Sequence, residues 1–386
     1  MDRPVIAIVS PGSFAIPSAT SSSVELVIEQ VARRLTHEVS PVVFGKIFRG
    51  RPKTEIVDGV KYVRVGAASA QAYIRQVGRR LAHYRPQVIQ VENRPRFVRT
   101  LRGMYPRAKL WLVLHSLTFV SKRHIGRGEL RACLAAADRI IVNSEFLKDQ
   151  IIRLAPKVRR KMIVNHLGAD TERFVSRWSD EGALKREALL GRLGLTGKRI
   201  ILYVGRLIEI KGVHHLLHAM PRIAAQVPDA VLLVIGGARY GSSRKTAYVR
   251  NLHRLGEKIP QHVRFIPFVP HSEISSWFGL ADVLVVPSNS REAFGLVNVE
   301  AMSVGVPVVA TRAGGMKEII QHGETGFLID APLLGRELPL WISLLLSNEL
   351  LARQMGEMSI NRVKEQFTWE HTAQRWLDLY RVVRKN

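Results

Sequence analysis

The chain has 386 residues, enough for two domains, and is 46% hydrophobic and 23% charged. This composition is typical of folded globular proteins and excludes a disordered, collagen-like or coiled-coil chain. No apolar run approaches the ~20 residues that cross a membrane, and the strand-like start at Val5 differs from a signal peptide. The single cysteine, Cys133, cannot form an internal disulfide, and no Cys/His cluster has the spacing of zinc ligands. We therefore expect a cytoplasmic protein.

The net charge is strongly positive, +26 at pH 7. Residues 1–180 carry 32 basic and 14 acidic side chains, a formal charge of +18, and the remainder carries +8. A basic half of this kind favours an anionic partner, such as a membrane surface, an acidic polymer or nucleic acid. A generally basic composition that keeps the chain soluble is the alternative. Few aromatic residues lie among the arginines and no nucleic-acid-binding motif is present, which disfavours nucleic acid.

Short β-branched runs alternate with amphipathic stretches, the pattern of βαβ units around a parallel sheet. In the first half the predicted strands are 5–9, 39–44, 60–65, 88–91, 110–114, 140–143 and 162–165. The predicted helices between them are 24–35, 70–83, 130–137 and 145–154. Residues 176–197 are polar and partly helical, and we interpret them as the connection between two domains.

The alternation resumes at residue 200. The predicted strands are 200–204, 231–235, 263–268, 283–286 and 308–310, and the predicted helices are 213–225, 246–255, 272–278, 296–304 and 316–321. The end of the chain is helical, with an apolar face between Trp369 and Val383. The fold class is therefore α/β, with two doubly wound, Rossmann-like domains at 1–180 and 181–365. We expect the closing helix, 366–386, to return to the first domain.

A candidate anion site follows the strand at 200–204. Gly205 allows a sharp turn, and Arg206 and Lys211 precede a helix whose N-terminal N–H groups favour an anion. A planar guanidinium and a compact ammonium suit a diphosphate. On their own, the two cations could equally be solvated loop residues. The segment lacks the Gly-Lys-Ser/Thr end of a Walker motif, and no Gly-x-Gly-x-x-Gly follows a strand, which disfavours nicotinamide and flavin cofactors.

A second candidate segment spans residues 286–302. A strand ends at Pro287 and a helix begins near Gly295, so the N–H groups of Phe294, Gly295 and Leu296 are placed to meet a phosphate. Glu300, in the second turn of this helix, can accept hydrogen bonds from two ribose hydroxyls. Glu292 precedes the helix, where a carboxylate can hold sugar hydroxyls or face a developing positive charge. The alternative is a glutamate that favours the helix dipole, with an incidental second one.

In these segments the chain resembles the retaining glycosyltransferases of family 4, which have the two-domain GT-B fold. The matching residues are Gly205-Arg206 with Lys211-Gly212, Glu292-x7-Glu300, Ala301-Met302-x-x-Gly305-x-Pro307, Gly314-Gly315 with Glu318, Asn165-His166-x-Gly168-x-Asp170 and Phe367-Thr368-Trp369-Glu370. They cover nearly the whole chain and are most similar to the group associated with bacterial spore coats.

The resemblance implies transfer of a hexose, with retention, from a nucleotide-diphosphate sugar, with a UDP-sugar favoured. The acceptor would be glycan-, lipid- or protein-linked, in envelope or spore-surface polysaccharide synthesis. The implied donor-binding residues are Gly205, Arg206 and Lys211 with the backbone of Phe294–Leu296 for the diphosphate, Glu300 for the ribose, and Phe268 and Val269 for the base. The implied catalytic residues are Glu292 and His115; for His115, a strand-end histidine without a ligand is the alternative. The resemblance implies no cofactor and no metal, because fixed cations and helix ends neutralise the leaving group.

The first loop departs from the family pattern. Relatives often have a Gly-Gly pair that opens the first helix, whereas this chain offers Gly12, Ser13, Phe14 and Ser22 as acceptor-binding candidates. Serine hydroxyls can cap the helix or bind an acceptor, but they lack the close backbone approach of glycine. Phe268 stands where glycine is common, which would reshape the base pocket.

Two basic segments have no assigned role. The loop 239–245 could touch the base, cover the site or simply be solvated. Arginines at 75, 79 and 80 share one predicted helix, and those at 94, 96, 99 and 102 share the next segment. The resemblance implies that such a surface docks on an anionic membrane or acidic polymer, so the protein would be cytoplasmic, at the inner membrane face or on the spore.

Three other functions remain open. A sugar-nucleotide epimerase of the same fold would need an acid/base pair on the sugar, and Glu292 and Glu300 form the only candidate pair. A glycosyl phosphorylase would cleave its substrate with phosphate instead of releasing a nucleotide. A non-catalytic, basic surface-binding protein would not need the intact set of Arg206, Lys211 and the two glutamates.

Overall fold

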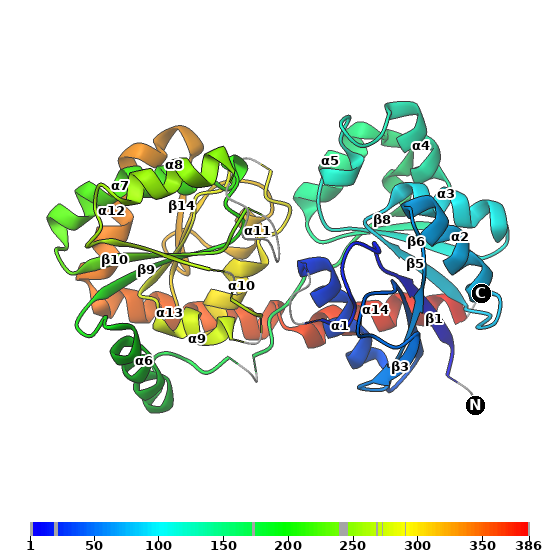
Figure 1. Cartoon of the computed structure of the whole chain (residues 1–386), viewed down its shortest axis with the longest axis horizontal. Coiled ribbons are helices and arrows are strands. Elements are labelled where there is room, and N and C mark those ends of the chain that lie inside the picture. The colour runs from blue at the N-terminus through cyan, green and yellow to red at the C-terminus, as the bar shows by residue number, and fades with distance from the viewer. Residues whose placement is uncertain are drawn as a thin grey trace. The chain divides into compact units, whose positions relative to one another are not determined.

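The computed structural model describes residues 3–18, 22–171, 174–238, 246–267, 269–271, 273–289 and 291–384. The contacts divide the chain into two units, residues 1–167 together with 369–386, and residues 168–368. Each unit is built on its own sheet (Figure 1). Within the described residues, no helix has the length and hydropathy needed to cross a bilayer.

The sheet of the first unit has eight strands in the order β3-β4-β2-β1-β5-β6-β7-β8, and only β3 is antiparallel. The strands are β1 (Val5–Val9), β2 (Ser40–Lys46), β3 (Thr54–Val57), β4 (Val60–Val65), β5 (Val88–Glu92), β6 (Lys109–Leu114), β7 (Arg139–Val142) and β8 (Met162–Val164). After β1 the chain first builds one side of the sheet and then returns to pair β5 on the other side of β1. The carboxyl ends of β1 and β5 therefore flank a topological switch point, where open α/β sheets bind ligands.

Helices cover the two faces of this sheet (Figure 1). Helices α1 (Ser23–Leu35) and α14 (Trp369–Arg384) pack together, as do α2 (Ala70–Leu81), α3 (Pro95–Met104) and α4 (Arg127–Ala135). The remaining helix is α5 (Glu145–Leu154). The ring of Trp111 in β6 stacks on Trp376 and Tyr380 of α14, with centroids 6.1 and 5.2 Å apart. These aromatic contacts join the C-terminal helix to the first unit.

The sheet of the second unit is parallel, with the order β11-β10-β9-β12-β13-β14. Its strands are β9 (Arg199–Val204), β10 (Ala230–Ile235), β11 (Val263–Ile266), β12 (Val283–Val286), β13 (Val308–Thr311) and β14 (Gly326–Ile329). The strand order reverses between β9 and β12. Their carboxyl ends therefore form a second switch point.

Two groups of helices cover this second sheet (Figure 1). Helix α7 (Val213–Gln226) packs on α8 (Ala247–Gly256) and α12 (Leu334–Ser347), and α10 (Leu296–Ser303) packs on α9 (Ile274–Leu280) and α13 (Glu349–Gln366). Helix α6 (Asp180–Leu193) lies against α9, and the short α11 (Met316–Ile319) precedes β14. Buried apolar residues of α7, α8 and α12 form one continuous core with β9 and β10.

The segment 176–197, which the sequence suggested as the connection between domains, lies within the second unit. Arg177 donates to buried Asp282 at 2.8 Å, and the Trp178 indole donates to the carbonyl of Gly305 at 2.7 Å. Local polarity could not show this, because the partners are more than a hundred residues away in the sequence. Two strands were also not predicted: β3 is an edge strand with Ile56 70% exposed, and β14 has only four residues.

Candidate active site

The loops after β9 and β12 meet at the switch point of the second unit. Lys211 ends a short 3₁₀ turn before α7, and its Nζ lies 2.5 Å from Oε2 of Glu292 in the loop after β12. A side chain at Gly212 would lie 1.9 Å from the carbonyl oxygen of Pro287, so glycine allows the two loops to approach. Arg206, in the same loop as Lys211, is exposed. The structure thus brings together three residues that the sequence proposed, and it adds the direct pairing of Lys211 with Glu292.

Glu292 is a charged group in an enclosed position. Burial alone would raise the pKa of its carboxyl, but the ammonium of Lys211, its hydrogen bond and the charge of Arg206 hold the pKa below the usual range. Glu292 therefore remains a carboxylate at neutral pH. A carboxylate that keeps its charge can stabilise positive charge on a reacting sugar.

The backbone around Glu292 is held by a second loop, after β13. The N–H of Gly315 donates to the carbonyl of Glu292 at 3.0 Å. Gly314 has a φ of +57°, and a Cβ at this position would lie 1.8 Å from the same carbonyl oxygen. Only glycine allows this approach, so the Gly314-Gly315 pair sets the position of Glu292.

Glu300 lies in α10, which begins at Leu296 with Gly295 as its N-cap and no side-chain capping bond. The segment expected to meet the diphosphate, Phe294–Leu296, is thus at a helix N-terminus. One carboxylate oxygen of Glu300 lies 2.8 Å from Nε2 of His271, which follows β11. His271 is beside Val269 in the loop expected to contact the base. The sequence analysis did not select His271, although a histidine after a strand was a usable signal.

His115 lies at the carboxyl end of β6 in the first unit. Its Nε2 is 2.8 Å from Oε2 of Glu92 at the end of β5, and its backbone N–H donates to Oδ1 of Asn93 at 3.0 Å. The other oxygen of Glu92 accepts from Gln90 at 2.6 Å, and Gln90 in turn accepts from Tyr380 of α14 at 2.8 Å. A carboxylate oxygen of Glu92 serves as the acceptor, so Nε2 is assigned as the donor of this hydrogen bond and Nδ1 is left for a ligand.

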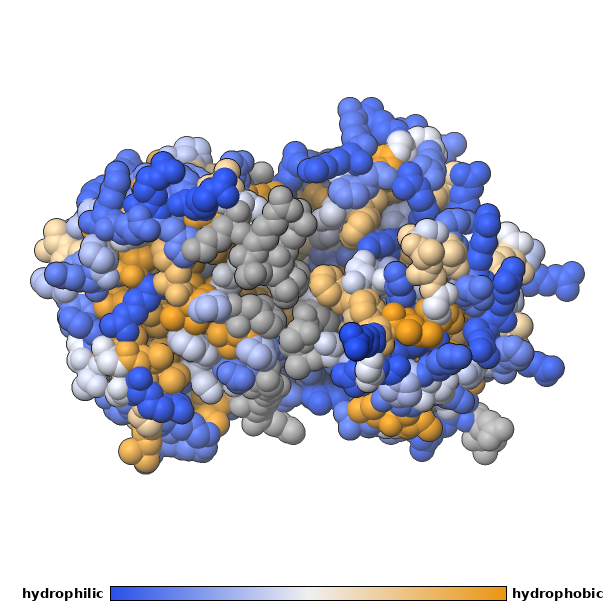
Figure 2. Space-filling model, viewed as in Figure 1, coloured by the Kyte–Doolittle hydropathy of each residue, from blue (hydrophilic) through white to orange (hydrophobic). Residues whose placement is uncertain are grey.

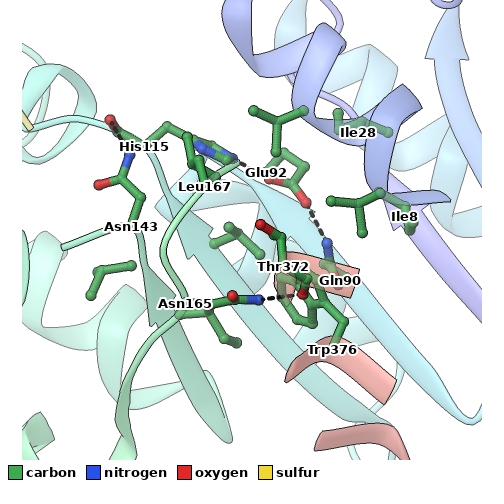
Figure 3. Close-up of a pocket in the computed structure, with 15 residues that line it drawn as sticks. Ile8, Ile28, Gln90, Glu92, His115, Asn143, Asn165, Leu167, Thr372 and Trp376 are labelled. Atoms are coloured by element: carbon green, nitrogen blue, oxygen red, sulfur yellow. Dashed lines mark hydrogen bonds and ion pairs between the residues drawn. The ribbon is translucent and has the colours of Figure 1, made fainter. Parts of the chain in front are cut away.

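Glu92 and Gln90 were missed by sequence analysis, although polar residues in a buried parallel strand are a signal. They line a cavity of about 20 Å³ between the sheet, α1 and α14. Figure 3 shows His115, Glu92 and Gln90 along it, with Asn143 beside His115, and Asn165 hydrogen-bonded to Thr372. The cavity is close to the volume of one water molecule and is too small for a sugar. We conclude that this cavity is part of the packing around His115 and its hydrogen-bond partners and is not a sugar-binding site.

The acceptor candidates of the first loop lie at the switch point between β1 and β5. Gly12 has a φ of +72°, and a Cβ added there would lie 3.0 Å from the ring of Tyr73. Ser13 accepts a hydrogen bond from Arg94 at 2.9 Å. Ser22 is the N-cap of α1 and its hydroxyl donates to Glu25. Phe14 is half-buried in the same loop.

Two further expectations, Phe268 in the base site and a role for the basic loop 239–245, concern positions that lie outside the described residues.

The arginines of the first unit do not form one uniform surface. Arg96 pairs with Glu129 at 2.7 Å, and Arg102 donates to Asp138 at 2.8 Å and to three backbone carbonyls. Arg75, Arg79, Arg80 and Arg99 are exposed, and no ion pair joins them to another described residue. Figure 2 shows long hydrophilic side chains projecting from the region of α2 to α5. The exposed part of the predicted patch is therefore smaller than the sequence suggested.

Two doubly wound units with helices at the C-terminus, each with charged residues at its switch point, are the architecture of enzymes of the GT-B fold. Family comparisons agree: the model for "Glycosyl transferases group 1" matches residues 186–362, and that for "Glycosyltransferase Family 4" matches residues 24–173. Spore coat protein SA of Bacillus subtilis is 31% identical over 97% of this chain and 98% of its own length. The putative glycosyltransferase YtcC of the same organism is 29% identical over 98% of this chain and 92% of its own.

Solved structures share the fold. Anabaena HepE, in complex with UDP-glucose, superposes with a TM-score of 0.78 over 98% of this chain and 99% of its own, at 20% identity. The chain belongs to the family 4 glycosyltransferases, and it is a transferase of the GT-B fold. The predicted family and fold are confirmed.

Proposed function

We propose that this enzyme transfers a hexose from a nucleotide-diphosphate sugar, with a UDP-sugar favoured, to a glycan-, lipid- or protein-linked acceptor, and retains the anomeric configuration. The observation that carries the donor assignment is the meeting of Lys211, Glu292 and Arg206 at the switch point of the second unit. The complex of HepE with UDP-glucose supports a UDP-sugar. The similarity to spore coat protein SA supports a product on the cell envelope or spore surface.

In this proposal the donor's diphosphate lies between Arg206 and Lys211, with the N-terminus of α10 as a further positive end. Glu300 accepts from the ribose hydroxyls. As the bond from the anomeric carbon to the diphosphate breaks, the growing negative charge on the leaving group is stabilised by the two cations more than in the ground state. These fixed charges do the work that a metal ion does elsewhere, so we propose that no metal or cofactor is required.

The acceptor hydroxyl forms the new bond to the anomeric carbon, and its proton passes to an oxygen of the departing diphosphate. The carboxylate of Glu292 faces the positive charge that develops on the sugar. His115, oriented by Glu92, is proposed to contact the donor sugar or its phosphate through Nδ1. Because bond formation and bond breaking occur on the same face, the configuration is retained.

The first test is thermal unfolding with UDP, GDP, ADP and dTDP at fixed salt. A ligand at 100 times its Kd stabilises by ~2.7 kcal/mol, which gives a clear shift for the matching nucleotide. NMR of the product made from the corresponding nucleotide-α-sugar then reports the anomeric configuration. An α-linked product supports retention, and a β-linked product contradicts it. Phosphate-dependent cleavage would instead indicate a phosphorylase, and conversion of the free nucleotide sugar an epimerase.

We also propose that the exposed arginines of α2 bring the enzyme to an anionic surface at the inner face of the membrane. Replacing Arg75, Arg79 and Arg80 with glutamine should weaken cosedimentation with vesicles that contain anionic lipid. The effect should shrink as salt rises, because these charges are screened. Equal binding of both proteins at low salt would contradict this proposal.

A further inference from the structure

Arg94 has a distinctive position at the switch point of the first unit. It directly follows the turn after β5, and its Nη2 donates to the hydroxyl of Ser13 in the loop after β1 at 2.9 Å. The guanidinium carbon lies 3.5 Å from the ring centroid of Phe119. Stacking on a ring face and a hydrogen bond at the edge hold the planar group in one orientation.

Arg94 has no acidic partner among the described residues. Its acceptors are the Ser13 hydroxyl and, at 3.5 Å, the carbonyl of Asn93. The buried guanidinium groups of Arg64 and Arg177 end on carboxylates, those of Glu55 and Asp282. Half-buried Arg375 ends on an amide and a carbonyl oxygen of residues 165 and 166. A guanidinium offers five N–H donors, so Arg94 keeps donors for a further acceptor.

The nearest acidic influence on Arg94 is Glu25, which acts on it electrostatically without an ion pair. Glu25 is fully buried; one carboxylate oxygen accepts from Ser22, and the other has no partner among the described residues. Burial raises the pKa of Glu25 and lowers the pKa of Arg94 to about 10. Arg94 therefore stays positively charged at neutral pH, without a paired counter-charge.

The start of helix α3, directly after this turn, adds a further positive end beside Arg94. Asn93 has a φ of +57°, a left-handed conformation that is uncommon for a residue other than glycine and often found at functional sites. Arg94 itself is the N-cap of the ten-residue helix α3 and provides no side-chain capping bond. The positive end of α3 thus lies beside an unpaired cation.

We propose that Arg94 binds an oxyanion carried by the acceptor, so that the substrate class is an anionic sugar or polyol with a carboxylate or phosphate group. The proposal rests on the proposed glycosyl transfer and names the acceptor class for it. Three observations favour an oxyanion as the ligand. Arg94 lies at a switch point, its guanidinium is held over Phe119 without an ion pair to a described residue, and α3 starts there without a side-chain cap. Ser13 then serves to orient Arg94, with its hydroxyl beside the bound anion.

The test measures binding of three probes to the full chain saturated with UDP, by calorimetry at constant ionic strength. The probes are D-glucuronate, D-glucose 6-phosphate and neutral methyl glucoside, so the first two distinguish a carboxylate from a phosphate. The variants are Arg94→Gln, Arg94→Lys and Arg99→Gln. Arg99 is an exposed residue of the same helix, and its replacement changes the net charge by the same amount.

We expect one anion to bind the unsubstituted protein about tenfold or more tightly than the neutral sugar. Arg94→Gln should abolish this preference for the anion, and Arg99→Gln should preserve it. Arg94→Lys keeps the charge but not the fork, and should be intermediate. Equal binding of charged and neutral probes, no binding of either anion, or an equal loss in the two glutamine variants would overturn the inference. UDP binding is measured in the same samples, and it should be unchanged in the Arg94 variants because Arg94 is not part of the donor site. Failure of the anion proposal with normal UDP binding is thus distinguished from failure of the proposed UDP site.

Discussion

Lys211 and Glu292 are 81 residues apart in the sequence, and their side chains meet at 2.5 Å beyond the carboxyl ends of β9 and β12. The ammonium and carboxylate neutralise one another in the absence of substrate. A diphosphate beside Arg206 would compete with Glu292 for Lys211. The pair therefore couples the cation proposed for the leaving group to the carboxylate proposed for the sugar.

Glu292→Gln should lower turnover by about a hundredfold, because the neutral amide no longer stabilises positive charge on the sugar. Affinity for free UDP should not fall, since Lys211 remains available to the diphosphate and no longer pairs with a carboxylate. Calorimetry and initial rates measure the two effects separately. Glu209→Gln, an exposed change two residues before Lys211, is the matched control. Equal losses in turnover and UDP affinity would assign Glu292 to the nucleotide instead.

Glu300→Ala should weaken UDP binding by about 1–3 kcal/mol, the usual cost of losing a charged hydrogen bond. The penalty should vanish with 2′,3′-dideoxy-UDP, which lacks the ribose hydroxyls. Calorimetry with both nucleotides checks this. Unchanged affinity for UDP would remove Glu300 from the ribose site.

His271→Ala should act in the same direction but more weakly, because His271 orients one oxygen of Glu300 at 2.8 Å. His271→Gln keeps a donor and should restore most of the affinity. If His271→Ala weakens UDP and dideoxy-UDP equally, its role is structural and independent of the ribose.

Gly314→Ala should reduce activity at least tenfold by moving the Glu292 loop, because the new Cβ would overlap the carbonyl oxygen of Glu292 at 1.8 Å. A tenfold loss corresponds to about 1.4 kcal/mol of transition-state stabilisation. Gly335→Ala is the control, since no atom lies within 4 Å of its added Cβ. Thermal unfolding shows whether both proteins are folded. Full activity in Gly314→Ala would mean that the loop can relax without disturbing Glu292.

Asp282→Asn should destabilise the protein by ~3–5 kcal/mol at pH 7, since it leaves Arg177 buried without a counter-charge. Burial alone would raise the pKa of Asp282, but Arg177 and Arg186 hold it below the ordinary value of 3.8. The contribution of the Asp282 carboxylate to the free energy of unfolding is therefore fully present above pH 3.8. It is lost as the pH falls through the pKa of Asp282 in the folded state, which is lower than 3.8. Urea unfolding at pH 7 and at acidic pH should show the gap between the two proteins closing. A gap of constant size would contradict the ionic origin.

Most strands and helices could be predicted because their residues carry the evidence locally. Apolar runs such as 5–9 and 283–286 are buried on both faces of a parallel sheet, and amphipathic repeats such as 24–35 cover those faces. The candidate motifs were equally local: Arg206 with Lys211, and Glu292 with Glu300, are close in the sequence. These observations determined the family, the fold class and the second-unit residues worth examining.

The pairing of distant charges was decided only by the tertiary structure. Strand order brings Lys211 to Glu292, Arg94 to Ser13 and Arg177 to Asp282, over separations of 81 to 105 residues. Periodicity tells which face of an element is buried, but not which neighbour an element receives, because that depends on how all strands pack together. For the same reason the sequence could only group Arg94 with several surface arginines. The structure places it at the switch point of the first sheet, without an acidic partner among the described residues.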